Sequence, residues 1–294
     1  MSNNFTSKKT GIFGLGKTGL SIYRFIAKKK LHPLCYDDND ETVKKFSIKY
    51  GENLITPIEN KKWQQLEQIF ISPGIPRNHR IFRLCKENNI CINSDIELFC
   101  NLNQKSKFIF ITGTNGKSTT TSLVHNMLEH NNMDFHMGGN IGIPVLDLPF
   151  NREGYVIEIS SFQIDLMRKV EPYISVLLNI TPDHLDHYKT MKEYISVKRR
   201  ITEHTNYKII NIDNLNTKKI YKNLLKLNED KIIGYYTKRK KGKILYYSQG
   251  KIHDSFFTKE SYNLKKIDNF SLSNKYNIEK ILVCYSIGSI LGIK

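Results

Sequence analysis

Short apolar runs alternate with amphipathic segments along the first part of the chain. The apolar runs, each of which favours a strand, are residues 10–13, 33–36, 68–71 and 90–92. Helical spacing of apolar residues occurs between them, at 18–30 and 79–88. Strands that alternate with helices in this way predict a parallel sheet with helices on its faces. The polar residues 101–107 then indicate a domain boundary.

The same alternation continues from residue 108 onward. The runs 155–159 and 173–180 are apolar and rich in β-forming residues, as buried parallel strands are. Residues 191–204 predict a helix, and residues 208–212 predict another strand that ends at Asp213. The second half of the chain is therefore also expected to be α/β.

Toward the C-terminus the apolar runs become shorter. The runs that predict short strands of a hairpin region are 231–235, 243–247 and 251–257. A dense basic segment, residues 238–243, lies between the first two and predicts a hairpin turn. A final helix is expected over residues 274–290. Its apolar face would carry Ile278, Ile281, Leu282 and Tyr285.

Composition fits a globular protein with a substantial core. A length of 294 residues favours two domains, and 39% hydrophobic with 25% charged residues allows burial of a real core. No run is long enough to span a bilayer, and the N-terminus lacks an apolar signal core. The five cysteines show neither CxxC nor zinc-type spacing. A cytoplasmic protein with reduced thiols and no membrane partner is expected.

The net charge of +17 raises the alternative of a nucleic-acid-binding protein. The lysines, however, are spread along the whole chain, and aromatic residues are not interleaved with the densest basic run as a stacking platform requires. A solvated basic surface is the favoured interpretation, and no nucleic-acid partner is expected.

A glycine-rich loop with a lysine follows the apolar run at 108–111. Its core reads Gly113-x-x-Gly116-Lys117-Ser118, and a helical pattern begins at Thr119. A strand, a glycine loop and a helix in this order form a phosphate cradle, in which the lysine reaches the outer phosphates and the serine hydroxyl lies on Mg²⁺. The standard pattern has glycine where this chain has Ile111, so the loop is a shortened variant typical of ATP-dependent amide ligases. The residues expected to bind ATP here are Gly113, Thr114, Asn115, Gly116, Lys117, Ser118 and Thr119.

A second glycine motif, Gly14-Leu15-Gly16-Lys17-Thr18-Gly19, follows the first strand. Asp37 and Asp38 come after the next strand, near the position of a ribose-binding acid. Taken alone, this motif indicates NAD, or only a tight strand–helix turn. A dehydrogenase would leave the other glycine loop unexplained. The favoured interpretation is therefore that the first domain holds a nucleotide-linked substrate and the second holds ATP.

Three further residues are candidates for chemistry. Glu158 ends an apolar strand at the edge where α/β sites form, and a carboxylate there can bind Mg²⁺. His184, on the loop 181–187, would either ligate a metal or orient a carboxylate; the alternative is an ordinary surface loop with two histidines. Lys198 is, on the residues alone, one of three basic residues on a helix face.

Taken in order, these motifs resemble the Mur ligase family. The stretches that carry the resemblance are residues 14–21, 72–75, 94–99, 111–120, 138–142, 158–163, 179–187 and 198–200. The first three are similar to the branch that adds D-glutamate to UDP-N-acetylmuramoyl-L-alanine in peptidoglycan precursor synthesis. The resemblance implies that ATP phosphorylates the substrate carboxylate, and that the amine of D-glutamate attacks the resulting acyl phosphate.

The resemblance also implies roles for individual residues. Lys117 and Ser118 would hold the phosphates and a first Mg²⁺ that Glu158 also ligates, and His184 would belong to a second Mg²⁺ site. Lys198 would be carbamylated, which turns an ammonium into a metal-ligating carboxylate. The expected contacts to the UDP substrate are Lys17, Thr18, Asp37, Asp38, Gly74, Asn140 and His184. Asn274 and Asn277 would contact adenine.

The expected organisation is a Rossmann-like UDP-substrate domain over residues 1–104 and a central P-loop ATP domain over residues 105–294. The family's third domain, which binds the amino acid, is expected to be absent from this chain, so a separate chain that carries it is an expected partner. Three alternatives stay open: a truncated nucleotide-binding fragment without activity, a Mur ligase for a different amino acid and, more distantly, an NAD dehydrogenase.

Overall fold

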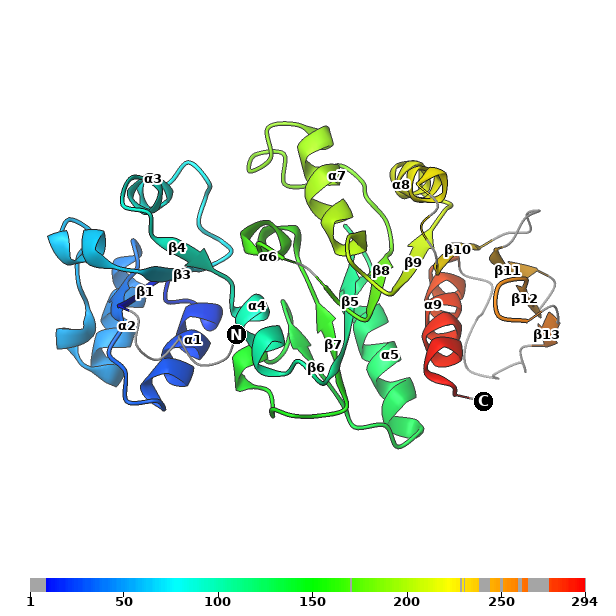
Figure 1. The fold of residues 1–294 in the computed structure, drawn as a ribbon, viewed down its shortest axis with the longest axis horizontal. Helices are drawn as coiled ribbons and strands as arrows, with labels where there is room; N and C mark the ends of the chain where they lie inside the picture. The colour runs from blue at the N-terminus through cyan, green and yellow to red at the C-terminus, as the bar shows by residue number, and fades with distance from the viewer. Residues whose placement is uncertain are drawn as a thin grey trace. The chain divides into compact units, whose positions relative to one another are not determined.

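The computed structural model describes residues 9–169, 171–227, 229, 231–237, 244–248, 251–258, 261–263 and 275–293. The chain forms two compact units, each built on its own sheet (Figure 1). The first unit contains residues up to 104 together with the short later segments 143–148 and 165–169. The second unit contains the remainder of the chain.

The first unit is a four-stranded parallel sheet in the order β2-β1-β3-β4. Its strands are β1 (Thr10–Phe13), β2 (Leu34–Tyr36), β3 (Gln68–Ile71) and β4 (Cys91–Asn93). Its helices are α1 (Lys17–Ala27), α2 (Asp40–Tyr50), α3 (Arg80–Glu87) and α4 (Asp95–Leu102), with short 3-10 turns η1 (Glu52–Leu54), η2 (Lys61–Gln65) and η3 (Val145–Asp147). Every residue of the two central strands is buried, as expected for a parallel sheet covered on both faces.

The core of the first unit gathers around Trp63. Its side chain is fully buried, and its Nε1–H donates to the carbonyl oxygens of Thr56 at 3.0 Å and Pro57 at 3.1 Å. The ring of Phe13 meets the indole edge-on at 6.2 Å between centroids. The single polar atom of this large side chain is thus satisfied, so its burial contributes to stability without the cost of a lost hydrogen bond.

The described residues of the second unit form a nine-stranded sheet in the order β13-β12-β11-β10-β9-β8-β5-β7-β6. The strands are β5 (Lys107–Thr112), β6 (Phe135–Gly139), β7 (Gly154–Glu158), β8 (Ile174–Leu177), β9 (Tyr207–Asn211), β10 (Ile232–Tyr236), β11 (Leu245–Ser248), β12 (Lys251–Asp254) and β13 (Ser261–Asn263). The helices are α5 (Lys117–His130), α6 (Ser161–Leu166), α7 (Met191–Arg199), α8 (Leu215–Lys226) and α9 (Lys275–Leu291), with the 3-10 turn η4 (Arg200–Thr202). Pairing is parallel from β6 to β11 and antiparallel at β12 and β13.

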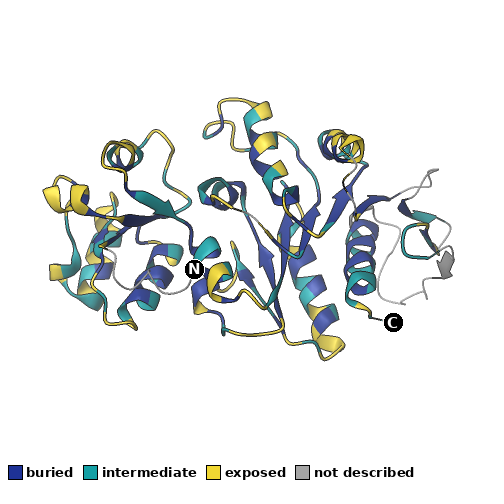
Figure 2. Cartoon of the chain, in the orientation of Figure 1, coloured by how far each residue is buried: buried dark blue, intermediate teal, exposed yellow. Residues whose placement is uncertain are grey.

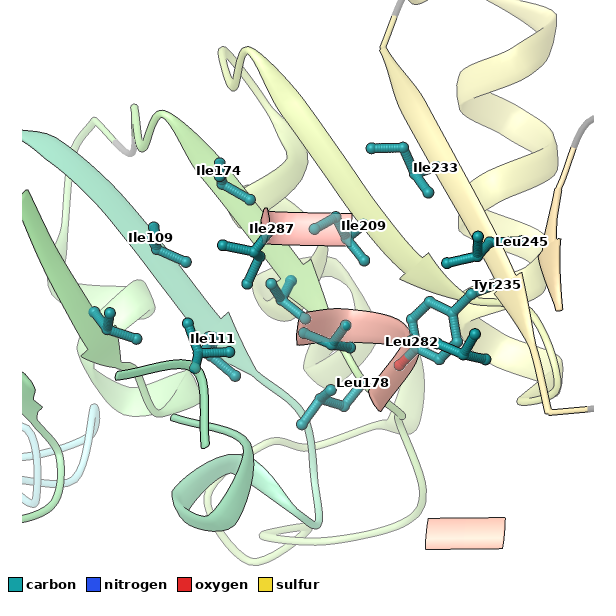
Figure 3. Close-up of a cluster of buried hydrophobic side chains, with 14 of the residues drawn as sticks. Ile109, Ile111, Ile174, Leu178, Ile209, Ile233, Tyr235, Leu245, Leu282 and Ile287 are labelled. Carbon is teal, nitrogen blue, oxygen red and sulfur yellow. The ribbon is translucent and has the colours of Figure 1, made fainter. Parts of the chain in front are cut away.

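An apolar cluster joins the middle of this sheet to its helices (Figure 3). Ile109 and Ile174 are register partners on neighbouring strands, and both are fully buried. Leu282 and Ile287 of α9 reach the same cluster and are also fully buried. Figure 2 shows the strands β5, β7, β8, β9 and β10 as a largely buried layer, which is why their sequences are nearly continuous apolar runs.

The predicted final helix is confirmed within the described residues as α9, which packs against α5 and the sheet (Figure 1). Ile278 and Leu282 are buried and Ile281 and Tyr285 are partly buried, as the predicted apolar face requires. Among the helices that the structure describes, α9 included, none is both long enough and apolar enough to cross a membrane.

The α/β fold class with parallel sheets is confirmed, and two local predictions are wrong. The strands β10 and β11 pair in parallel, so they are not the two antiparallel strands of the predicted hairpin. The basic residues 238–243 themselves lie outside the described residues. The helix predicted over 191–204 ends at Arg199 and continues as a 3-10 turn, where the Thr202 hydroxyl donates to the Arg199 carbonyl at 2.7 Å.

Candidate functional site

The carboxyl ends of β5, β7 and β8 lie side by side in the sheet of the second unit. β5 leads into the glycine loop, β7 ends at Glu158, and β8 leads into residues 178–187. Ligands of parallel sheets bind at this edge. The topology therefore brings together three of the segments that the sequence singled out.

The backbone of the glycine loop (residues 113–118, called the phosphate loop) leaves little room for a side chain at Gly113 and has a positive φ at Gly116. A Cβ at Gly113 would lie 3.0 Å from the Leu178 Cβ and 3.2 Å from the Asn179 nitrogen. Gly116 has φ +83° and lies immediately before α5, which begins at Lys117 without a capping side chain. A helix N-terminus that no side chain caps is an electropositive end suited to an anion.

Two lysine ammonium groups donate to one loop carbonyl. Lys117 Nζ lies 3.0 Å from the Gly113 oxygen and 2.8 Å from the Thr114 oxygen. Lys198 Nζ lies 3.0 Å from the same Gly113 oxygen and 3.3 Å from Thr112 Oγ1. Burial lowers the pKa of Lys117, while Glu158 acts in the opposite direction. The loop thus collects positive charge where phosphate oxygens would lie.

Lys198 is the more perturbed of the two. Its side chain is 1% exposed, and burial lowers its pKa to about 7, with the charge of Lys117 adding to the effect. Its Nζ lies 5.0 Å from the centre of the Tyr194 ring. A substantial fraction of Lys198 is therefore a neutral amine near neutral pH.

Glu158 carries a carboxylate oxygen without a protein partner. The side chain is 1% exposed; Oε1 accepts from Asn140 Nδ2 at 2.9 Å, and buried Oε2 has no hydrogen-bond partner among the described residues. The backbone of Asn140 also donates to the Glu158 carbonyl at 2.9 Å. This close approach needs Gly139, which has φ +110° and whose Cβ would lie 2.3 Å from the Glu158 carbonyl oxygen. An unpartnered buried carboxylate oxygen fits a cation ligand.

The donor set suits Mg²⁺ only in part. Glu158 Oε2 is a hard oxygen ligand, and Ser118 lies exposed in the first turn of α5. Within the described part of the chain, no three His, Cys, Asp or Glu side chains gather into a ready metal site. Mg²⁺ is often held by one or two carboxylates plus substrate phosphates, so this sparse set is compatible with it. Lys198 as an ammonium repels a cation, whereas its carbamate would not.

His184 lies on an exposed loop with φ +52°. Its Nε2 is 3.4 Å from Asp183 Oδ2, and its ring lies 4.7 Å from Phe162 and 6.5 Å from Tyr194. Tyr194 in turn hydrogen-bonds to Thr114 Oγ1 at 3.2 Å. The structure therefore places His184 two contacts away from the glycine loop, and it does not bring His184 into contact with Glu158 or Lys198.

The turn of the first glycine motif is held by glycine packing and by hydrogen bonds to neighbouring segments. Gly14 has φ +92°, and a Cβ at Gly19 would lie 1.9 Å from the Gly14 oxygen, so the helix can approach the turn only with glycine there. Asp37 Oδ2 accepts from the Leu15 nitrogen at 2.6 Å. Ser72 Oγ donates to the Gly14 oxygen at 2.8 Å. Asp37 and Ser72 thus contact the loop, and in dinucleotide-binding sheets the acid at this position binds a ribose hydroxyl.

The remaining predicted contacts of this unit are at the surface. Lys17 and Gly74 are exposed, Thr18 is partly buried, and Asp38 Oδ2 lies 2.8 Å from His79 Nε2. Of the predicted adenine contacts, Asn277 is a partly buried residue of α9, and Asn274 lies outside the described residues.

Sequence reasoning missed some residues that shape the site. Asn179 and Tyr194 both hydrogen-bond to the phosphate loop, and His79 pairs with Asp38. Asn179 had a detectable signal, because it is a polar residue near the end of the apolar run 173–180, whose strand ends at Leu177.

Two sheets with a glycine loop each define a nucleotide-binding α/β protein. The chain belongs to the Mur ligase family: the Mur ligase middle domain matches residues 111–288, and the MurD-like N-terminal domain of Mur ligases matches residues 8–94.

Two curated relatives from the genus Rickettsia share one name. The chain is 41% identical over 295 residues to the UDP-N-acetylmuramoylalanine–D-glutamate ligase of Rickettsia prowazekii, an alignment that covers 99% of this chain and 65% of the relative. It is also 41% identical over 287 residues to the same-named ligase of Rickettsia bellii, covering 97% of this chain and 63% of that relative. The chain thus spans a little under two thirds of the length of these relatives.

Solved structures support the fold. A Neisseria meningitides UDP-N-acetylmuramate:L-alanyl-gamma-D-glutamyl-meso-diaminopimelate ligase aligns with TM-score 0.58 and 15% identity, over 96% of this chain and 94% of that one. A murein peptide ligase from Psychrobacter arcticus aligns with TM-score 0.56 and 15% identity, over 97% and 65%. At such identities the likeness concerns the fold alone.

Proposed function

We propose that this chain carries the nucleotide-binding parts of an ATP-dependent ligase that adds D-glutamate to UDP-N-acetylmuramoyl-L-alanine. The names of its relatives support the reaction class and substrates. The observation that carries the proposal is that Lys117 and Lys198 both donate to the Gly113 carbonyl, while Glu158, which acts electrostatically on Lys117, keeps a buried oxygen without a partner among the described residues. Residues 1–104 would bind the UDP substrate, and residues 105–294 would bind ATP.

The reaction needs two anions to meet. The alanyl carboxylate attacks the γ-phosphorus of ATP and ADP leaves; the amine of D-glutamate then attacks the acyl carbon, loses a proton and displaces phosphate. Lys117 can transfer its two hydrogen bonds from loop carbonyls to phosphate oxygens, and the uncapped start of α5 adds a second source of positive potential. Bound Mg²⁺ would supply further neutralisation of charge between carboxylate and phosphate. Ser118 and Glu158 are the residues that would hold it, and His184 would serve a second ion.

Lys198 is proposed to act as its carbamate. Its neutral amine attacks CO₂, a nitrogen–carbon bond forms and a proton is released, so a buried cation becomes an anion with two oxygens. The pKa of about 7 makes the reactive neutral form available near neutral pH. The modified side chain would join Glu158 as a metal ligand.

The UDP substrate is proposed to lie along the first glycine motif. Asp37 and Asp38 would face its uridine, with Lys17, Thr18 and Gly74 beside them. In support, Asp37 accepts from the Leu15 nitrogen in the turn after β1, and Lys17 and Thr18 follow that turn at the start of α1. Asn140 would contact the muramoyl part while it holds Glu158. Asn277, with Asn274, would contact adenine.

The test measures binding and turnover on the same protein. The purified chain is mixed with ATP, Mg²⁺ and UDP-N-acetylmuramoyl-L-alanine, with and without D-glutamate, while phosphate release and product mass are followed. Product formed only with D-glutamate supports the full proposal. Saturable binding of ATP and the UDP substrate without turnover would restrict the chain to nucleotide binding and favour a separate chain as partner. Product with another amine, or no binding at all, would contradict the proposal.

A further inference from the structure

The apex of the phosphate loop is held by Asn179, a residue outside the set proposed to touch substrates. The Asn179 carbonyl oxygen accepts from the Thr114 nitrogen at 2.9 Å. Its side-chain Oδ1 accepts from the Asn115 nitrogen at 2.9 Å, and its Nδ2 donates to the Asn115 oxygen at 3.0 Å. Both polar backbone groups of Asn115 are therefore satisfied by one side chain.

These bonds cross between segments that are far apart in the chain. Asn179 and Asn115 are separated by 64 positions, so the contact is not the capping of a local turn. Thr181, two residues after Asn179, makes a second contact with the loop. Thr114 Oγ1 accepts from the Thr181 nitrogen at 3.0 Å and donates to the Thr181 oxygen at 3.2 Å. The segment 179–181 thus holds two consecutive loop residues.

We propose that Asn179 is a positioning residue that keeps the phosphate loop in its binding shape before nucleotide arrives. Because it engages both the N–H and the C=O of Asn115, that residue's backbone cannot rotate without breaking two hydrogen bonds at once. A loop ordered in advance has less conformational freedom left to lose on binding, which strengthens binding. This inference rests on the proposed binding of ATP.

The experiment compares ATP with adenosine on the full chain. Asn179→Ala removes both side-chain bonds and keeps the backbone bond to Thr114. We expect its dissociation constant for Mg·ATP to rise roughly tenfold, the scale of one or two lost hydrogen bonds, while that for adenosine changes little. Isothermal titration gives both constants. Backbone hydrogen exchange of residues 113–117 in the nucleotide-free protein should become faster.

A matched control is available at the same strand end. Asn216 Nδ2 donates to the Ile180 oxygen at 2.9 Å, so Asn216→Ala removes an amide–carbonyl bond to the residue next to Asn179. This control should leave the ATP dissociation constant unchanged. Equal effects of the two variants, or equal losses of ATP and adenosine binding, would show that the role is only structural.

The outcomes separate this inference from the proposed function. If the wild-type chain does not bind ATP, the proposed function itself fails. If the wild type binds ATP and Asn179→Ala binds it equally well, only the positioning role is overturned. Should Asn179→Ala fail to fold, Asn179→Ser is held to the same comparison, since a serine side chain is too short to reach both groups of Asn115.

Discussion

At the residue scale, burial changes the acid–base behaviour of Lys198. Its amine is enclosed beside Lys117, and its pKa falls to about 7 because the charged form loses hydration. A charged amine is difficult to keep in such a place unless it has a function. Stability and activity should therefore respond in opposite directions to its removal.

Lys198→Met is expected to stabilise the chain and abolish ligation. Methionine keeps the volume and removes a buried charge, and the partner Thr112 Oγ1 still donates to the Ile159 oxygen at 2.7 Å. A gain of about 1 kcal/mol in the free energy of unfolding is expected from replacing a buried charge by an apolar side chain. Urea unfolding and phosphate release measure the two effects. Lys192→Ala, an exposed lysine of the same helix, should change neither. Retained ligation in Lys198→Met would contradict the metal-ligand role.

The stability difference should depend on pH with a defined sign. The pKa of Lys198 is about 7 in the folded chain and 10.5 as its ordinary value, so between these values the unfolded state binds more protons. Wild-type stability therefore rises with pH across this window. The advantage of Lys198→Met is largest at or below about pH 7 and shrinks toward pH 10. Unfolding at several pH values in CO₂-free buffer checks this, and a constant advantage would contradict the assigned pKa.

At the element scale, the edge formed by the ends of β5, β7 and β8 could be predicted because each strand is a short buried run followed by polar residues. Residues 10–13 and 68–71 were predicted with the observed bounds, because each is a short run that a turn sequence follows. The direction of pairing between β10 and β11 could not be predicted, since run length does not encode a partner. The amide of Asn179 was missed because its contact depends on how closely β8 approaches the loop, which is a tertiary property.

Gly139→Ala should be strongly destabilising, because the end of β6 allows no Cβ there. The new methyl would have to sit 2.3 Å from the Glu158 carbonyl oxygen at φ +110°. A loss of about 3 kcal/mol is expected from strain and contact together. Gly142→Ala is the control for backbone strain alone, since Gly142 has φ +68° with nothing within 4 Å, and it should cost about 1 kcal/mol. Similar losses in the two variants, measured by urea unfolding, would contradict the steric argument.

At the scale of the whole molecule, the chain has two sheets, each with its own apolar cluster and its own glycine loop. The separate loops suggest that the two nucleotides are bound by different residues. Their effects on stability should then be separable by mutation.

ATP and UDP should each protect the chain from unfolding. A ligand that binds only the folded state, present at about 100 times its dissociation constant, raises the free energy of unfolding by about 2.7 kcal/mol. Lys117→Ala should remove most of the protection by Mg·ATP and leave that by UDP, whereas Asp37→Ala should do the reverse. Thermal unfolding with each ligand measures all four combinations. Loss of both protections in either variant would contradict two independent sites.

Lys117 makes two hydrogen bonds to the carbonyls of its own loop. Its long side chain is thus already held in place. When a ligand binds, Lys117 exchanges carbonyl acceptors for ligand oxygens, and little further side-chain entropy is lost. An incoming group that offers a single acceptor replaces only one of those bonds and gains little. A group with several anionic oxygens replaces both and adds charge. We therefore expect the loop to bind polyphosphates more tightly than weakly charged ligands.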